Sequence, residues 1–280
     1  MPIYQALILG IVQGLTEFAP VSSSGHLILV PWLFDWPILQ DVALNKTFDV
    51  ALHMGTFFGA LAYFWRDVAT YVRGFFRSIA RRSLSEPEER LAWFILLGTI
   101  PGAVVGAGLE GVIQEDLGAP WLIATMLVVF GVLLYYVDRV APKRKEVGDV
   151  TALDALLIGT AQAIALSPGV SRSGVTITAA RWRGLDRETA ARFSFLLSLP
   201  VIGGAGVYKG LDLVKDGLPP GMGPPFFWGF VASAISGFLV IWLLLAYVRK
   251  RDFAPFVVYR LAAALLVFGL IVSGVRSATI

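Results

Sequence analysis

The stretch that decides the fold reads Gln-Gly-Leu-Thr-Glu-Phe-Ala-Pro-Val-Ser-Ser-Ser-Gly-His, residues 13–26. It breaks an apolar run that starts at Ile3, well short of the roughly 20 apolar residues with which a helix crosses a bilayer. Polar backbone at membrane depth is tolerated only where protein buries it or a cavity receives it. We therefore predict a re-entrant hairpin, which enters and leaves the membrane on one side.

A second apolar segment, residues 152–178, is broken in the same way by Ser-Pro-Gly-Val-Ser-Arg-Ser-Gly at 167–174. A shift of 149 positions superimposes the two breaks, and the matched pairs are Gly10 and Gly159, Gln13 and Gln162, Val21 and Val170, Ser22 and Ser171, Ser24 and Ser173, and Gly25 and Gly174. Ser/Gly clusters also recur wherever membrane helices pack closely, but a shared register disfavours that explanation. The sequence predicts a single domain, 1–280, with repeat halves of approximately 1–140 and 150–280.

Six further apolar runs are long enough to span a membrane, three after each hairpin. They cover approximately Phe48–Trp65, Leu91–Leu109, Trp121–Val137, Phe193–Tyr208, Phe226–Val248 and Phe256–Val275. Composition agrees, because 56% of the residues are hydrophobic and only 15% are charged, against about 25% charged in soluble domains. We predict an all-α integral membrane protein with six full transmembrane helices plus two re-entrant helical hairpins. Three crossings per half make the repeat an inverted-topology repeat.

The distribution of basic residues orients the chain. If the first hairpin starts outside, 18 of the 23 Lys and Arg residues lie on the cytoplasmic side, four lie outside, and Arg172 lies in the second hairpin. This asymmetry follows the positive-inside rule. It places both termini outside and lets the hairpins enter from opposite faces, so that their polar tips meet within the membrane. Arg260 counts among the cytoplasmic residues, which leaves Arg172 as the only cation expected at membrane depth.

Glu17 is the acidic residue of the first apolar stretch. An ionisable group inside a membrane is costly and indicates function, although a helix cap at the interface is an alternative. Gln13 lies four residues earlier, on the same helical face. Its amide oxygen and the carboxylate can share Mg²⁺ or Ca²⁺, or the two side chains can simply form a hydrogen bond.

The serine cluster of the first hairpin supplies a candidate nucleophile. Ser23 needs a nearby base to attack, and His26 is the imidazole of that hairpin. His53, the second of the two histidines, is expected to be structural. Hydroxyl and backbone N–H groups of the turn are expected to bind an anionic group, which adds Ser22, Ser24 and Gly25 to the predicted substrate-binding residues. The absence of cysteine excludes thiolate chemistry and disulfides.

The second hairpin supplies a cation. Arg172 carries a planar fork of donors that suits phosphate oxygens, and an ion pair with Glu17 is the alternative. Asp49 is expected to face water. The other substrate-binding candidates of this hairpin offer hydroxyl donors or close backbone approach, namely Gly169, Ser171, Ser173, Gly174 and Thr176.

Through the motifs at 13–26 and 168–176, the sequence resembles the undecaprenyl-diphosphatase family linked to bacitracin resistance. The resemblance spans essentially the whole chain, including Thr-Phe-Asp at 47–49, where the first full span starts. It implies hydrolysis of undecaprenyl diphosphate to undecaprenyl phosphate with a divalent cation. This reaction recycles the carrier lipid for peptidoglycan and other envelope polymers.

The resemblance also assigns roles by position. It implies an acidic motif at Gln13 and Glu17, a serine at Ser23, a histidine at His26 and a phosphate-binding arginine at Arg172. Many relatives have Glu where Gln13 stands, so this chain offers a cation less negative charge at that position.

We expect a phosphatase in the bacterial cytoplasmic (inner) membrane whose active site faces the periplasmic or extracellular side. Its partners are a polyprenyl diphosphate substrate and membrane lipid, with no nucleic acid, and a homodimer is left open. Ser23, His26 and a water molecule held by Glu17 all stay open as nucleophiles. A polyprenyl-phosphate transporter or flippase is the main alternative, because inverted repeats are common in transporters. A non-catalytic scaffold explains neither Glu17 nor Arg172 at depth.

Overall fold

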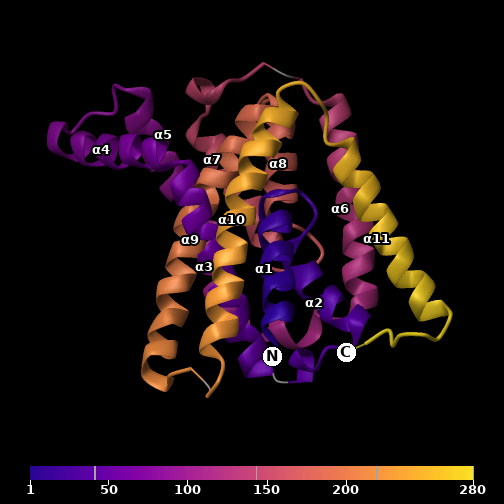
Figure 1. Cartoon of the computed structure of the whole chain (residues 1–280). Coiled ribbons are helices and arrows are strands. Elements are labelled where there is room, and N and C mark those ends of the chain that lie inside the picture. Colours follow the sequence, from indigo (N-terminus) through magenta and orange to yellow (C-terminus); the bar gives the residue numbers. More distant parts are fainter. Residues whose placement is uncertain (41, 143, 219, 280) are drawn as a thin grey trace.

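The computed structural model consists of helices joined by short connections (Figure 1). It describes residues 1–280 except 41, 143, 219 and 280, and it describes no side chain for 39, 40, 42, 43, 107, 109–116 and 212–216. The helices are α1 (Ile3–Phe18), α2 (Ser23–Phe34), α3 (Val42–Tyr63), α4 (Trp65–Arg81), α5 (Pro87–Asp116), α6 (Pro120–Val140), α7 (Ala152–Ile164), α8 (Arg172–Trp182), α9 (Arg187–Asp216), α10 (Gly223–Val248) and α11 (Ala254–Val272), with short 3₁₀ turns at Pro37–Gln40 and Val147–Asp149. The described residues contain no β-strand, only an isolated bridge between Lys145 and Leu185. The all-α prediction is confirmed.

The helices differ in how they run relative to the long axis of the molecule (Figure 1). Helices α3, α5, α6, α9, α10 and α11 extend along this axis, whereas α4 lies across it at one end. The pair α1 and α2 occupies the half that contains both chain termini, and the pair α7 and α8 occupies the opposite half. The two short helix pairs therefore approach each other from opposite ends.

Five helices are long and apolar enough to cross a membrane. These spans are Pro87–Gly106, Pro120–Val140, Arg187–Leu211, Gly223–Val248 and Ala254–Val272, and they correspond to five of the six predicted spans. Helix α3 covers most of the remaining predicted span, Phe48–Trp65, but is not among the five helices. Of the cations used to orient the chain, Lys143 and the side chain of Lys215 lie outside the described residues.

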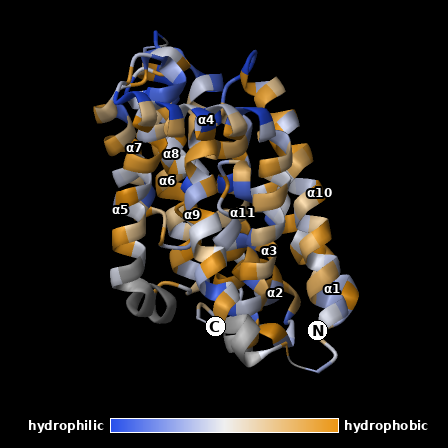
Figure 2. Ribbon diagram, turned by 90° about the vertical axis from the view of Figure 1, so that its left-hand side faces the viewer, coloured by the Kyte–Doolittle hydropathy of each residue, from blue (hydrophilic) through white to orange (hydrophobic). Residues whose placement is uncertain are grey.

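The outer surface suits lipid rather than water. Large apolar side chains are strongly exposed on the last helix, including Val258 at 65%, Leu265 at 71% and Val272 at 87%. Hydrophobic residues cover much of the sides of the bundle, while hydrophilic residues gather at the end that carries α4 (Figure 2). The chain is a multi-pass membrane protein by the length and composition of these helices.

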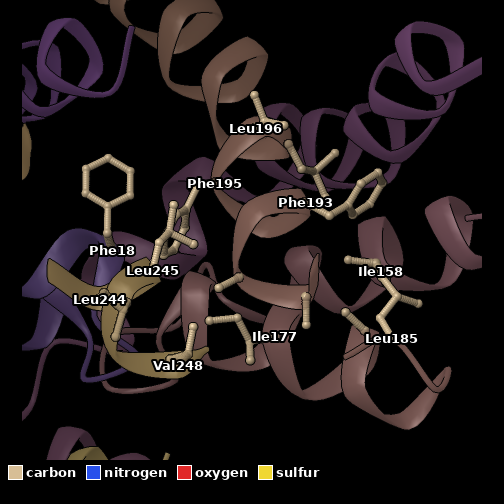
Figure 3. Packing of buried hydrophobic residues seen from close by; sticks show 14 of the residues in the cluster. Phe18, Ile158, Ile177, Leu185, Phe193, Phe195, Leu196, Leu244, Leu245 and Val248 are labelled. Atoms are coloured by element: carbon tan, nitrogen blue, oxygen red, sulfur yellow. The ribbon is translucent and has the colours of Figure 1, made fainter. Parts of the chain in front are cut away.

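The largest buried apolar cluster packs the end of α1 and the second hairpin against the long helices. It joins residues of α7, α8, α9 and α10 (Figure 3). Phe18, the last residue of α1, packs edge-on against Phe195 of α9, with ring centroids 5.3 Å apart. Both hairpins are thus fixed to long helices by tight side-chain packing.

Candidate active site

Each hairpin turns at a serine in the left-handed region of backbone space. Pro20 ends α1, because its ring pushes the preceding residue into an extended conformation. Ser22 then has φ 78° and Ser171 has φ 75°. The side-chain oxygen of each serine accepts a hydrogen bond from the backbone N–H three residues later and thereby caps the next helix. The donors are Gly25 N at 3.4 Å and Gly174 N at 3.1 Å. Such strained turns cost about 1–3 kcal/mol each and cluster at functional sites.

The two hairpin tips touch, as the sequence predicts. The Ser22 hydroxyl oxygen also accepts a hydrogen bond from Gly169 N at 3.0 Å, and the Ser173 hydroxyl donates to the Ala19 carbonyl at 3.0 Å. Gly169 has φ 92°, and a side-chain carbon there would lie 2.6 Å from the Ile123 carbonyl oxygen. A glycine is therefore required where the second hairpin meets the first.

Glu17 lies at the centre of this junction and is only 5% exposed. Its Oε2 accepts hydrogen bonds from the Ser23 hydroxyl at 2.5 Å and from the Gln13 amide at 2.9 Å. Its Oε1 forms an ion pair with Arg172, which also donates to the Ser198 carbonyl at 3.4 Å. Side chains of both hairpins therefore converge on one carboxylate. The ion pair that the sequence left open is present, and Glu17 does more than cap a helix.

His26 has hydrogen-bond partners other than Ser23. Its Nδ1 lies 2.7 Å from the Ser22 carbonyl, which can only accept, so Nδ1 carries a hydrogen. Its Nε2 lies 2.9 Å from the Tyr259 hydroxyl, and the two rings stack with centroids 5.6 Å apart. Both ring nitrogens are thus engaged, and Glu17 is the group placed to take the Ser23 proton. Sequence reasoning missed Tyr259, which no motif contains.

His53 lies beside the carboxylate, a placement that the sequence did not predict. Its Nε2 is 3.6 Å from Glu17 Oε2, and its Nδ1 is 2.7 Å from the Asp49 carbonyl. The Asp49 side chain is half-buried rather than freely exposed. Glu17 lies on α1 and His53 on α3, so only the tertiary packing of these helices reveals their proximity.

Arg260 was also misplaced by sequence reasoning. It is fully buried in α11 rather than at the cytoplasmic surface. Its Nε donates to the Leu127 carbonyl at 2.9 Å, and its terminal nitrogens donate to the Pro20 carbonyl at 3.1 Å and the Gly169 carbonyl at 2.9 Å. Arg172 is therefore not the only cation at the hairpin tips. The sequence did contain a signal for this burial, because Arg260 lies inside the last apolar span. A charged side chain there is costly unless it forms hydrogen bonds or ion pairs.

The other predicted substrate-binding residues gather at the same junction, but most of their hydroxyls are used within the protein. Thr176 donates to the Arg172 carbonyl at 2.7 Å and lies 2.6 Å from the Ser194 hydroxyl. Ser171 and Ser173 lie 3.3 Å apart through their hydroxyls. Ser24 is half-buried and forms no hydrogen bond through its side chain within the described residues.

One atom of the site fits a cation. Gln13 is fully buried, and its Oε1 has no hydrogen-bond partner among the described residues. Buried polar atoms are normally satisfied, and an amide oxygen beside a carboxylate suits a hard cation. No group of three or more His, Cys, Asp or Glu side chains gathers in the described part of the chain. A cation there would take its other ligands from water and phosphate oxygens, as Mg²⁺ commonly does.

The fold and this junction define a class of protein, a helical multi-pass membrane protein with a carboxylate, a serine and an arginine assembled where two short hairpins meet. Within this class the chain belongs to one family, because residues 6–266 match the family described as bacitracin resistance protein BacA. The family resemblance inferred from the two motifs is confirmed.

Individual relatives cover almost the entire chain. The undecaprenyl-diphosphatase of Pelotomaculum thermopropionicum is 48% identical over 267 residues, which are 95% of this chain and 96% of the relative. That of Geobacter sulfurreducens is 48% identical over 264 residues, 94% and 96% of the two chains. That of Thermomicrobium roseum is 43% identical over 284 aligned positions, 99% and 100% of the two chains.

Proposed function

We propose that the protein hydrolyses undecaprenyl diphosphate to undecaprenyl phosphate and inorganic phosphate, recycles this carrier lipid for cell-wall synthesis, and thereby contributes to bacitracin resistance. Family membership and the names of the relatives support this activity. The observation that carries the proposal is the short Ser23–Glu17 hydrogen bond of 2.5 Å beside the Arg172 ion pair. A nucleophile, its base and a phosphate-binding cation are thereby assembled at one point.

Substrate binding requires Arg172 to change partners. Its side chain is 18% exposed, whereas that of Glu17 is 3% exposed, so an arriving diphosphate meets the guanidinium first. Arg172 then donates its paired N–H groups to phosphate oxygens. The prenyl tail lies among the membrane-spanning helices.

The reaction proceeds in two steps. Ser23 Oγ attacks the terminal phosphorus while Glu17 accepts the hydroxyl proton. The bond to the bridging oxygen breaks, and undecaprenyl phosphate leaves with the electron pair and receives the proton from Glu17. In the second step Glu17 takes a proton from water, which attacks the phosphoserine. The bond from phosphorus to Oγ breaks, Glu17 returns the proton to Ser23, and inorganic phosphate leaves.

Gln13 and Glu17 are the residues that would hold a divalent cation, Mg²⁺ or Ca²⁺. Such an ion, when bound, neutralises charge on the diphosphate and orients it. The unpaired Gln13 Oε1 supports this assignment. Catalysis otherwise rests on positioning and charge stabilisation by the protein, as is general for phosphoryl transfer.

The proposed membrane arrangement has six crossings, two re-entrant hairpins and two inverted halves, approximately 1–140 and 150–280. Corresponding glycines support the repeat, because Gly10 of α1 approaches Gly229 of α10 and Gly159 of α7 approaches Gly98 of α5. The basic residues favour a cytoplasmic location for the end that carries α4. The site then opens toward the outer face of the cytoplasmic membrane.

The test is release of inorganic phosphate from undecaprenyl diphosphate by purified protein in detergent, with and without a chelator. Glu17→Gln, Ser23→Ala and Arg172→Ala are expected to lower kcat by roughly a hundredfold or more. Thr160→Ala removes an exposed hydroxyl on α7 and serves as the matched control. Wild-type protein that is folded and yet releases no phosphate with any divalent cation would refute the proposal.

Three further measurements identify the nucleophile, test the transport alternative and determine the oligomeric state. Acid quenching during turnover traps phosphoserine at Ser23 if the serine is the nucleophile, whereas attack on the phosphorus by His26 or by a water molecule held by Glu17 leaves Ser23 unmodified. Lipid flipping without phosphate release would instead identify a polyprenyl-phosphate transporter. The particle mass in detergent reports whether the protein is the homodimer that the sequence left open.

A further inference from the structure

Helix α4 has an apolar face that no other part of the structure covers. Trp65, Val72, Phe76 and Ile79 are 59%, 49%, 65% and 50% exposed. Their spacing of seven, four and three residues places them on one side of a helix. Because α4 lies across the long axis at one end of the bundle (Figure 1), this side is not part of a membrane-spanning surface.

A second face of α4 carries arginines in excess of acids. The acidic residue of the helix, Asp67, is paired with Arg192 of α9 at 2.5 Å. Arg77 is paired with both Glu88 and Glu89 at the start of α5, at 2.7 and 2.8 Å. Four other arginines are exposed and form no ion pair within the described residues. Arg66 lies over the ring of Trp65 at 5.2 Å, and the other three are Arg73, Arg81 and Arg82.

The third face holds α4 against the bundle. Gly74 and Ser78 are buried, and the Ser78 hydroxyl accepts a hydrogen bond from Trp93 Nε1 of α5 at 2.9 Å. Phe75 packs on the ring of Trp93 with centroids 4.8 Å apart. The helix is therefore fixed in this orientation rather than loosely attached.

A shallow cavity that is largely open to the surface, about 420 Å³ in volume, lies at the C-terminal end of α4, lined by Ser78, Ile79, Arg82, Ser83, Leu84 and Trp93. It combines an exposed guanidinium with apolar walls. A ligand that fits both carries negative charge next to a hydrocarbon segment.

We propose that α4 lies in the plane of the membrane surface and that Arg73, Arg81 and Arg82 bind the phosphate groups of anionic phospholipids there. The exposed apolar stripe enters the boundary of the acyl chains, as in interfacial amphipathic helices with basic polar faces. Long arginine side chains reach from such a stripe to the headgroups. The cavity beside Arg82 receives the upper part of one acyl chain. This lipid-binding surface is separate from the hairpin junction and does not depend on the proposed reaction.

Native mass spectrometry of the detergent-purified protein with added phosphatidylglycerol tests the lipid binding. Each arginine near a membrane surface contributes about fivefold to binding of anionic lipid, so the triple variant Arg73→Gln, Arg81→Gln, Arg82→Gln is expected to weaken it by roughly a hundredfold. The control removes three exposed cations elsewhere, Arg144, Lys250 and Arg251, also by substitution with Gln. Loss with the first variant alone supports the site. Equal loss in both variants, no loss in either, or equal binding of phosphatidylcholine would overturn it.

Spin labelling tests the depth of the helix, and the absence of native cysteine makes any introduced label unique. In phosphatidylglycerol nanodiscs, a label at Phe76→Cys is expected to be more accessible to oxygen than to a water-soluble nickel complex. A label at Thr70→Cys, which is exposed on the arginine face of α4, is expected to show the opposite preference. Nickel access that is equally high at both positions would place α4 in water and refute the proposal.

Discussion

Replacing Arg260 with methionine is expected to destabilise the protein by about 3 kcal/mol and to separate the hairpin tips. Besides its bonds to the Leu127, Pro20 and Gly169 carbonyls, one terminal nitrogen of Arg260 lies 3.2 Å from each of two further carbonyls, of Met126 and Val170. That nitrogen has only two hydrogens, so at most four bonds form at once.

The estimate combines two opposing effects. Hydrogen bonds to a charged group contribute about 1.5–3 kcal/mol each. Methionine offsets part of this loss, because it removes the cost of burying a guanidinium. Misplacement of reacting groups by about 1 Å can cost a hundredfold in rate, so kcat is expected to fall about tenfold to a hundredfold while KM changes less.

Arg181→Met provides the control for buried charge as such. Arg181 is also fully buried, and it pairs with Asp138 at 2.9 Å, away from the hairpin tips. Thermal unfolding, monitored by tryptophan fluorescence, should show a loss of stability in both variants. Phosphate release measured well below the unfolding temperature should fall only for Arg260→Met. Wild-type kcat in folded Arg260→Met, or an equal loss in Arg181→Met, would show that Arg260 does not position the hairpins for catalysis.

Three other substitutions probe the junction, and a fourth, Gln162→Leu, is the control for the first. Gln13→Leu is expected to raise the divalent cation concentration needed for half-maximal activity by about tenfold. Gln162→Leu removes a buried amide without a partner in the described structure, so it should keep activity and raise stability by about 1 kcal/mol. An equal loss of activity in both variants would exclude the cation assignment. Ser22→Ala removes the acceptor for the Gly169 amide and should cost about 1–3 kcal/mol in unfolding free energy, a figure that unchanged thermal stability would contradict. Tyr259→Phe removes one hydrogen bond of about 1 kcal/mol and should lower the unfolding temperature slightly while leaving kcat within about threefold. A larger loss of kcat would contradict this and would show that the hydroxyl takes part in proton transfer.

The sequence allowed prediction of the elements whose signal is local. Apolar length located five of the long helices, and the polar breaks at 13–26 and 167–174 located both hairpins. The repeat register placed Ser22 and Ser171 at equivalent turns, which indeed share a backbone conformation. Charge inside apolar segments drew attention to Glu17 and Arg172, and the ion pair between them is the alternative that the sequence left open, while their catalytic roles stay predictions. These predictions succeeded because burial of polar groups in an apolar medium is costly at any such position.

The failures concern residues that reach the site through tertiary packing. His53 and Arg260 lie 36 and 243 positions from Glu17 in the sequence, and no helical period connects helices that pack side by side. Arg260 was assigned to a surface because it lies near the predicted start of its span. The sequence left His26 and Glu17 open as the base for Ser23, and it could not show that the His26 nitrogens lie against Ser22 and Tyr259.

The position of Arg260 in the chain has a consequence for biosynthesis. Its bond to the Pro20 carbonyl joins residues 240 positions apart, so one of the last helices to leave the ribosome completes a junction begun by the first. A chain truncated before α11 would contain both motifs and the Glu17–Arg172 pair, yet it would lack the group that ties the two tips together. We therefore expect activity on the carrier lipid to appear only after α11 has been synthesised and inserted.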